Sequence, residues 1–199
     1  MNPNRRLAAA AAFAALTFGA TLAVSPPLAG AHDGGDDGPT PAPASAPTGE
    51  LTGAQRQVIR EATRSLRDPA AAEAAGYLPT DACAELPGVG GMGQHWVNPV
   101  LLDDGGRIDP TTPEVLLFAP GKSGRLELLG VEYVAFDVDQ DLSTAADRPT
   151  MLGHPLEGPM PGHEDGMPVH YDLHAWVFTN NPSGDLATWN PRVSCEVGR

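Results

Sequence analysis

The chain has 199 residues, with 25 acidic against 12 basic residues and a formal net charge of −13. Such a surface repels nucleic acid and anionic lipid, so we exclude nucleic acid as a partner. It attracts cations, although excess carboxylate also serves simply to keep an exported protein soluble.

The first 31 residues have the pattern of a cleavable secretory signal peptide. Arg5 and Arg6 precede an apolar stretch from Leu7 to Val24, and Ala29-Gly30-Ala31 is a small-x-small cleavage site. A transmembrane anchor is the alternative, but the stretch is rich in alanine and no charged stop follows it. We therefore expect a secreted or cell-envelope protein with no stable membrane insertion after cleavage.

Export bears on the two cysteines, Cys83 and Cys195. Outside the cytoplasm two thiols with no third partner usually pair, which predicts a Cys83–Cys195 disulfide. Closing a loop of this length contributes about 4–5 kcal/mol in the chain-entropy model. Catalytic or metal-binding thiols are the alternative, and neither cysteine has a Cys or His at ligand spacing.

Three segments follow from the composition: the signal peptide (1–31), a flexible acidic and Pro/Ala-rich linker (32–50), and one globular domain (51–199). The domain should begin with helices. Thr52 and Gln55 form a capping box, and Ala54, Val58, Ala62 and Leu66 recur on one face. Asp68 then caps a short helix that starts at Pro69 and ends at Gly76.

After Cys83 the chain has apolar runs of strand length between turn-forming clusters. We predict strands over Gln94–Leu102, Pro113–Phe118, Arg125–Phe136 and Val169–Thr179, with Met151–Pro168 too rich in Gly and Pro for regular structure. The fold class is therefore α+β: N-terminal helices followed by a mostly antiparallel β-sheet or small open barrel.

The most informative segment for function is the last of these strands. Its alternation places Val169, Tyr171, Leu173, Ala175 and Val177 on an apolar face, and His170, Asp172, His174, Trp176 and Phe178 on the other. Two imidazoles with a carboxylate between them can converge on one metal ion. The alternative is a set of hydrogen-bonded structural histidines.

Two distant residues complete this candidate site. His95 follows a glycine-rich run that permits close backbone approach. Glu132 shares strand parity with Leu126, Leu128, Val134 and Phe136, so it should be a buried carboxyl that needs a cation. A β-bulge that turns Glu132 to solvent is equally compatible with the sequence.

Every methionine after the leader has a histidine three residues later, in the pairs Met92/His95, Met151/His154, Met160/His163 and Met167/His170. Met92, His154, Met160, His163 and Met167 are therefore secondary metal candidates. Thioethers with imidazole favour copper, whereas imidazole with carboxylate suits zinc, iron or manganese, which we prefer. Loop methionines packing onto the core would leave the same pattern.

Trp96, Trp176 and Phe178 are candidates to line an apolar pocket beside the histidines, which would suit a small organic ligand. They could equally complete a core. The sequence lacks a Gly-x-Ser-x-Gly elbow, a phosphate-binding loop and His-Glu-x-x-His, so serine hydrolases, nucleotide enzymes and zincins are disfavoured.

Several motifs together resemble a group of uncharacterised exported bacterial proteins, and the resemblance spans roughly Ala70 to Cys195. It implies a shared fold and transfers no catalytic role. The histidine and glutamate pattern is also loosely similar to that of cupins, without their glycine spacing. The motifs that carry the resemblance are AAGY (74–77), GGMGQHWVNP (90–99), GVEY (130–133), MPVHYDLHAW (167–176) and NPRVSC (190–195).

Three functions fit these observations. The first is an exported small metal-binding protein with a His/carboxylate site. The second is a small cupin-like metalloenzyme acting on a small organic substrate, with an open position on the metal. The third is a non-catalytic envelope protein with structural histidines.

Overall fold

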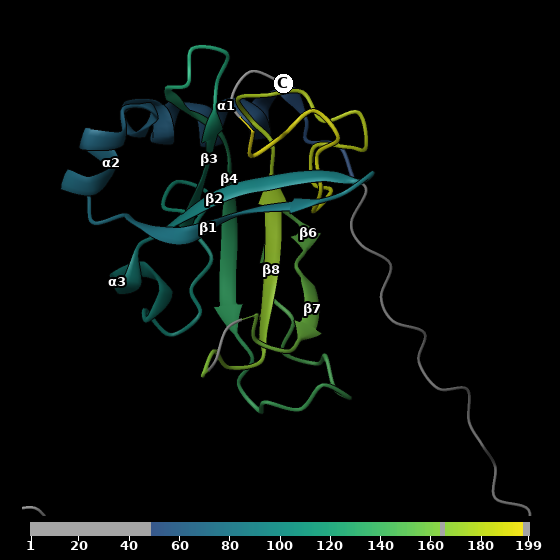
Figure 1. Cartoon of the computed structure of the whole chain (residues 1–199). Helices are drawn as coiled ribbons and strands as arrows, with labels where there is room; N and C mark the ends of the chain where they lie inside the picture. Colours follow the sequence, from purple (N-terminus) through teal and green to yellow (C-terminus); the bar gives the residue numbers. More distant parts are fainter. Residues whose placement is uncertain (1–48, 164–165, 197–199) are drawn as a thin grey trace, which may run out of the picture. The chain divides into compact units, whose positions relative to one another are not determined.

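The computed structural model describes residues 49–163 and 166–196, which all lie within one unit of the chain (Figure 1). The predicted signal peptide and most of the predicted linker fall outside these residues. Among the described helices, none is both long enough and apolar enough to cross a membrane.

The domain begins with α1 (Gly53–Thr63), a 3-10 turn (Arg64–Arg67) and α2 (Pro69–Ala74). The predicted capping box is present, because the Thr52 and Gln55 side chains and backbone N–H groups bond reciprocally. The Asp68 carboxylate accepts from the Ala70 N–H, as expected of an N-cap. Gly76 follows α2 with φ of 95°, a conformation that glycine adopts without strain.

The predicted buried face of α1 is wrong by one position. Ile59 and Thr63 are the buried residues, whereas Val58 is 43% exposed. Thr63 tolerates burial because its hydroxyl donates to the Ile59 carbonyl, one turn earlier. Alanines gave the sequence pattern too little contrast to distinguish neighbouring faces.

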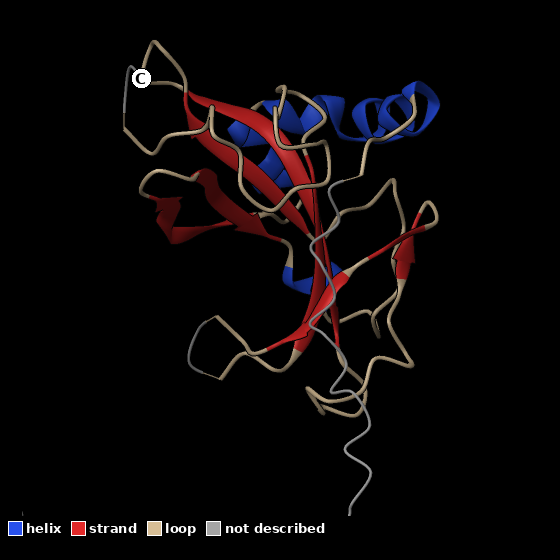
Figure 2. Cartoon of the chain, turned by 90° about the vertical axis from the view of Figure 1, so that its right-hand side faces the viewer, coloured by secondary structure: helices blue, strands red, loops and turns tan. Residues whose placement is uncertain are grey.

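The sheet is open and antiparallel, with six strands in the order β1-β2-β3-β4-β8-β7, so the predicted α+β class is confirmed. In Figure 1, β1 and β2 run across β4 and β8, and Figure 2 shows the resulting curl of the sheet. A separate pair joins β5 (Thr150–Met151) to β6 (His154–Pro155). The six strands are β1 (Leu78–Leu86), β2 (Gly90–Val97), β3 (Val115–Pro120), β4 (Leu126–Phe136), β7 (Glu157–Met160) and β8 (His170–Ala175).

The predicted strands differ from the observed ones at several points. The last strand ends at Ala175 and not at Thr179, because the Trp176 N–H bonds to the Asp185 carbonyl outside the sheet. Residues 99–102 form a short helix, α3 (Pro99–Leu102), because Asn98 caps the N–H groups of Val100 and Leu101. Strand β1 was missed. Met151–Pro168, predicted to lack regular structure, contains the end of β5, all of β6, and β7. The pairing of β7 with β8 outweighs its poor local propensity for strand.

The two faces of the sheet bury different groups. One face packs on the helices, and its core includes Phe118, Tyr133 and Leu173, each fully buried. The other face carries a smaller cluster that includes Val115, Leu117 and Trp176, next to buried histidines and carboxyls. Period-two alternation separates the two populations, except where a β-bulge interrupts it in β4.

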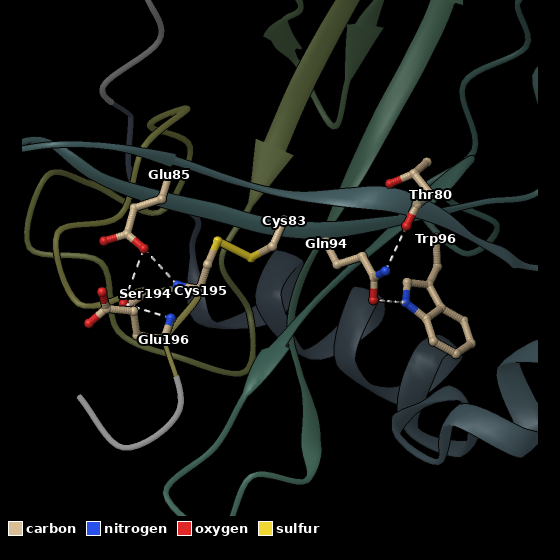
Figure 3. Close-up of a disulfide and its surroundings, with 8 residues drawn as sticks. All are labelled: Thr80, Cys83, Glu85, Gln94, Trp96, Ser194, Cys195 and Glu196. Carbon is tan, nitrogen blue, oxygen red and sulfur yellow. Dashed lines mark hydrogen bonds between the residues drawn. A yellow bond between two sulfur atoms is a disulfide. The ribbon is translucent and has the colours of Figure 1, made fainter.

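The predicted disulfide is present between Cys83 of β1 and Cys195, with Cα atoms 5.7 Å apart (Figure 3). The Glu85 carboxylate beside it accepts from the Ser194 hydroxyl and the Cys195 N–H. These contacts attach the C-terminal segment to the edge strand of the sheet, and a backbone bridge from Gly91 to Asn190 adds to them.

Candidate metal centre

A cavity of about 820 Å³ lies on the face of the sheet opposite to α1 and α2. Its walls are largely apolar, with Val97, Val115, Val134 and Phe136 from three neighbouring strands. The ionisable groups among the described lining residues are four histidines and three carboxyl groups, namely His95, His163, His170, His174, Glu132, Glu157 and Asp172. An apolar wall with a few convergent polar groups is typical of a ligand site.

The first group of potential ligands consists of His95, Glu132 and His174. One donor atom from each residue lies within 4.8 Å of the others, and His95 Nε2 is 3.4 Å from Glu132 Oε2. The rings of His95 and His174 meet edge to face with centroids 6.1 Å apart. Such a set can close on a single ion with small side-chain adjustments, since metal–ligand bonds are about 2 Å long.

Three strands place these side chains. Glu132 lies directly opposite His174 in the β4–β8 ladder, which puts the two on one face. His95 comes from β2 and reaches past β3, where Val115 is the neighbour of Glu132. The curl of the sheet shortens this span, which is about 10 Å between next-nearest strands of a flat sheet.

A β-bulge in β4 determines which way Glu132 points. The β3–β4 pairing slips between Leu117/Gly130 and Phe118/Leu128, so Leu128 packs on the helix side while Glu132 faces the cavity. Glu132 is therefore buried at 6% exposure, and the expected shared face with Leu128 is wrong. Gly130 is required at the bulge, because a Cβ there would lie 2.7 Å from the Ala175 carbonyl oxygen.

Burial controls the protonation of this group. It lowers the pKa of His95 to about 4 and that of His174 to about 3, with nearby histidines adding to both shifts. It raises the pKa of the Glu132 carboxyl well above the usual range, with the Asp172 carboxylate as the second cause. Both imidazoles are thus neutral near pH 7, with lone pairs free to bind a cation.

The environment of His174 argues most strongly against a purely structural role for the histidines. It is 2% exposed, yet neither ring nitrogen has a hydrogen-bond partner among the described residues. A buried polar group without a partner costs about 1–3 kcal/mol. Structural histidines are normally hydrogen-bonded, so this imidazole fits that role poorly.

A second group consists of His163, His170 and Asp172, again with one donor atom from each within 4.8 Å of the others. His170 and Asp172 are buried and belong to β8, whereas His163 is exposed on the preceding loop. The alternation in the sequence predicts Asp172, His170 and His174 in one site. The structure instead divides these three residues between two groups, because β8 extends past both.

The three aromatic residues predicted to line the pocket are not among the residues that line this cavity. Trp96 packs on the helix side against Phe118, with ring centroids 4.8 Å apart, and Phe178 also contacts that core. Trp176 is fully buried beside His174 and donates to the Ala187 carbonyl, but it does not line the cavity. Trp189 lines the cavity instead, and the irregular C-terminal segment that carries it gave no periodic signal in the sequence.

Three of the four Met-x-x-His pairs lie at the cavity, and the fourth does not. Met92, Met160 and Met167 line the cavity together with the histidine of each pair. Met151 is fully buried in the helix-side core, and His154 belongs to β6, outside both donor groups. Three of the four pairs therefore share one cavity, where thioethers accompany the imidazoles.

Glu157 is a cavity carboxyl that sequence analysis missed. It lies opposite Asp172 in the β7–β8 pairing and accepts from the Thr188 hydroxyl at 3.0 Å. Burial raises the pKa of Glu157, and it also raises the pKa of Asp172 to about 7, with the charge of Glu157 as the second cause. Glu157 reaches the cavity only because β7 pairs with β8, and the local sequence does not predict a strand there.

No protein-family model, curated protein or solved structure matches this chain.

Proposed function

We propose that this protein is a small exported metal-binding protein that holds a divalent transition-metal ion between His95, Glu132 and His174. The observation that carries the proposal is the buried, unpartnered imidazole of His174 within ligand range of His95 and Glu132. A cation would satisfy that lone pair and would compensate the burial of the Glu132 carboxylate.

The competing interpretation, a set of structural histidines, requires hydrogen-bond partners that His174 lacks among the described residues. The donor set also restricts the metal. Two imidazoles and a carboxylate suit zinc, iron or manganese, and copper is less favoured for this group. Export is a separate part of the proposal: it rests on the leader pattern and is supported by the Cys83–Cys195 disulfide.

The proposal is tested by elemental analysis of untagged protein equilibrated with Zn²⁺ and freed of excess metal. We expect stoichiometric zinc in the wild type and a loss of one equivalent in His95→Ala and His174→Ala. The affinity of that site should fall by at least about 100-fold, because even outer-shell changes cost 10–100-fold. Chelation should lower the melting temperature of the wild type.

His154→Ala is the matched control, since His154 is a half-buried histidine outside both donor groups. It should bind as much zinc as the wild type. His95→Ala should fold normally, because the His95 side chain is 20% exposed and its loss should leave the core intact. A loss of zinc in this variant is therefore not explained by misfolding. Absence of stoichiometric metal from the wild type, or full zinc content in His95→Ala and His174→Ala, contradicts the proposal.

One observation favours a second candidate, a metalloenzyme acting on a small organic substrate. Three protein ligands leave a coordination position open, and the adjoining cavity of about 820 Å³ has apolar walls. Azide, a small anion that binds open metal positions, should then change the visible absorption of Co²⁺-loaded protein. An unchanged spectrum would indicate a saturated ion and rule this candidate out.

A further inference from the structure

The second donor group lies in the same cavity as the first. Glu132 and Asp172 are diagonal neighbours on β4 and β8, because Glu132 lies opposite His174 and Asp172 is two residues away along β8. Diagonal neighbours on one face are about 7–8 Å apart. Each group nevertheless has its own two imidazoles and one carboxyl, so neither needs a ligand from the other.

His170 is oriented as a metal ligand would be. Its Nδ1 lies 3.3 Å from the Pro168 carbonyl oxygen, which can only accept, so Nδ1 carries the proton. The lone pair is then on Nε2, which faces Asp172 Oδ2 at 3.9 Å. Fixing the tautomer through the remote nitrogen is the arrangement found around metal-bound histidines.

Asp172 supplies an independent observation. It is 3% exposed, and its Oδ1 has no hydrogen-bond partner among the described residues. A buried carboxylate oxygen without a donor is costly unless a cation is present. Its neighbours on the cavity side are Glu157, Glu132 and the two imidazoles, and no lysine or arginine is among the described residues that line the cavity.

Thioether groups distinguish this end of the cavity. Met160 lies directly opposite His170 in the β7–β8 pairing, and both residues line the cavity, as does Met167. Thioethers are soft ligands that tolerate a transition metal and do not attract Ca²⁺ or Mg²⁺. The surroundings therefore match the imidazoles in selecting a transition-metal ion.

We propose that the cavity holds a second divalent transition-metal ion, bound by His163, His170 and Asp172. The inference rests on the proposed function, since it makes the same cavity a two-ion site. His163 is the exposed member of the set, so this ion is the one nearer to solvent.

The test is the zinc stoichiometry of untagged protein, measured by elemental analysis and by titration with Zn²⁺. We expect two equivalents of bound zinc in the wild type and in the His154→Ala control. His163→Ala and His95→Ala should each bind one equivalent, and the variant that combines these two substitutions should bind none. His163 is exposed, so its replacement should not affect folding. Asp172→Asn, which keeps the shape of the side chain, should also bind one equivalent.

The outcomes separate the two proposals. One equivalent in the wild type, lost in His95→Ala and kept in His163→Ala, overturns the second site and leaves the first. Two equivalents that persist in His163→Ala and Asp172→Asn also overturn it. No bound zinc in the wild type overturns both.

Discussion

The two faces of the β4–β8 ribbon are built from the same strands but bury opposite kinds of group. On the helix side, Val131, Tyr133, Tyr171 and Leu173 are almost completely buried within one apolar core. On the cavity side, the same strands also bury histidines and carboxyls among apolar residues such as Val134, and His174 and Asp172 have unpartnered atoms. Apolar burial on the helix side therefore stabilises the fold, whereas the unpartnered polar groups on the cavity side destabilise it, as is usual at functional sites.

The largest expected effect is on the helix side. Leu173→Ala removes a fully buried side chain and should lower the free energy of unfolding by about 2–5 kcal/mol through lost burial and the cavity left behind. Urea unfolding of the metal-free protein measures this. Val138→Ala, at an 85% exposed position, is the control and should change the value by no more than about 0.5 kcal/mol. A loss below about 1 kcal/mol for Leu173→Ala would contradict the assignment of the core.

An intermediate effect concerns Glu114, a buried carboxyl whose Oε2 accepts from the Val134 N–H. Burial raises its pKa from 4.5 to about 7, so the folded state binds this proton more tightly than the unfolded chain. Its contribution to stability is therefore complete below about pH 4.5 and is lost as the pH rises to about 7.

Glu114→Gln removes this titration and keeps an acceptor for the Val134 N–H. Between pH 4.5 and 7.5 the wild type should lose up to about 3 kcal/mol of unfolding free energy relative to the variant. Denaturant unfolding across this range measures the difference. Parallel pH profiles would show that Glu114 titrates alike in both states.

The smallest effect tests the cavity face and has the opposite sign. His174→Leu replaces an unpartnered buried imidazole by an apolar side chain of similar size. The metal-free protein should become more stable by about 1 kcal/mol, while the stabilisation by zinc is reduced. Thermal melting with and without Zn²⁺ measures both. A clear loss of stability in the metal-free variant would mean that His174 has a structural role.

The sequence predicts the helix caps and the strand face that depend only on residues close together in the chain. The caps of α1 and α2 follow from Thr52, Gln55 and Asp68, and the apolar face of β8 follows from its period-two pattern. The buried face of α1 was missed, because Val58 next to Ile59 is equally apolar and the alanines at 54 and 62 favoured the face that carries Val58. Strand β7 was missed because its pairing partner, β8, lies ten residues further along the chain.

Residue identity and strand periodicity are thus enough to name the side chains available for a metal: the two histidines and the aspartate of β8, and the distant His95 and Glu132. Their grouping depends on the folded sheet. The bulge at Gly130 turns Glu132 into the cavity, the curl of the sheet brings His95 within 3.4 Å of it, and the loop before β8 gives His163 to a second group. These are long-range consequences of strand pairing, which local periodicity does not encode.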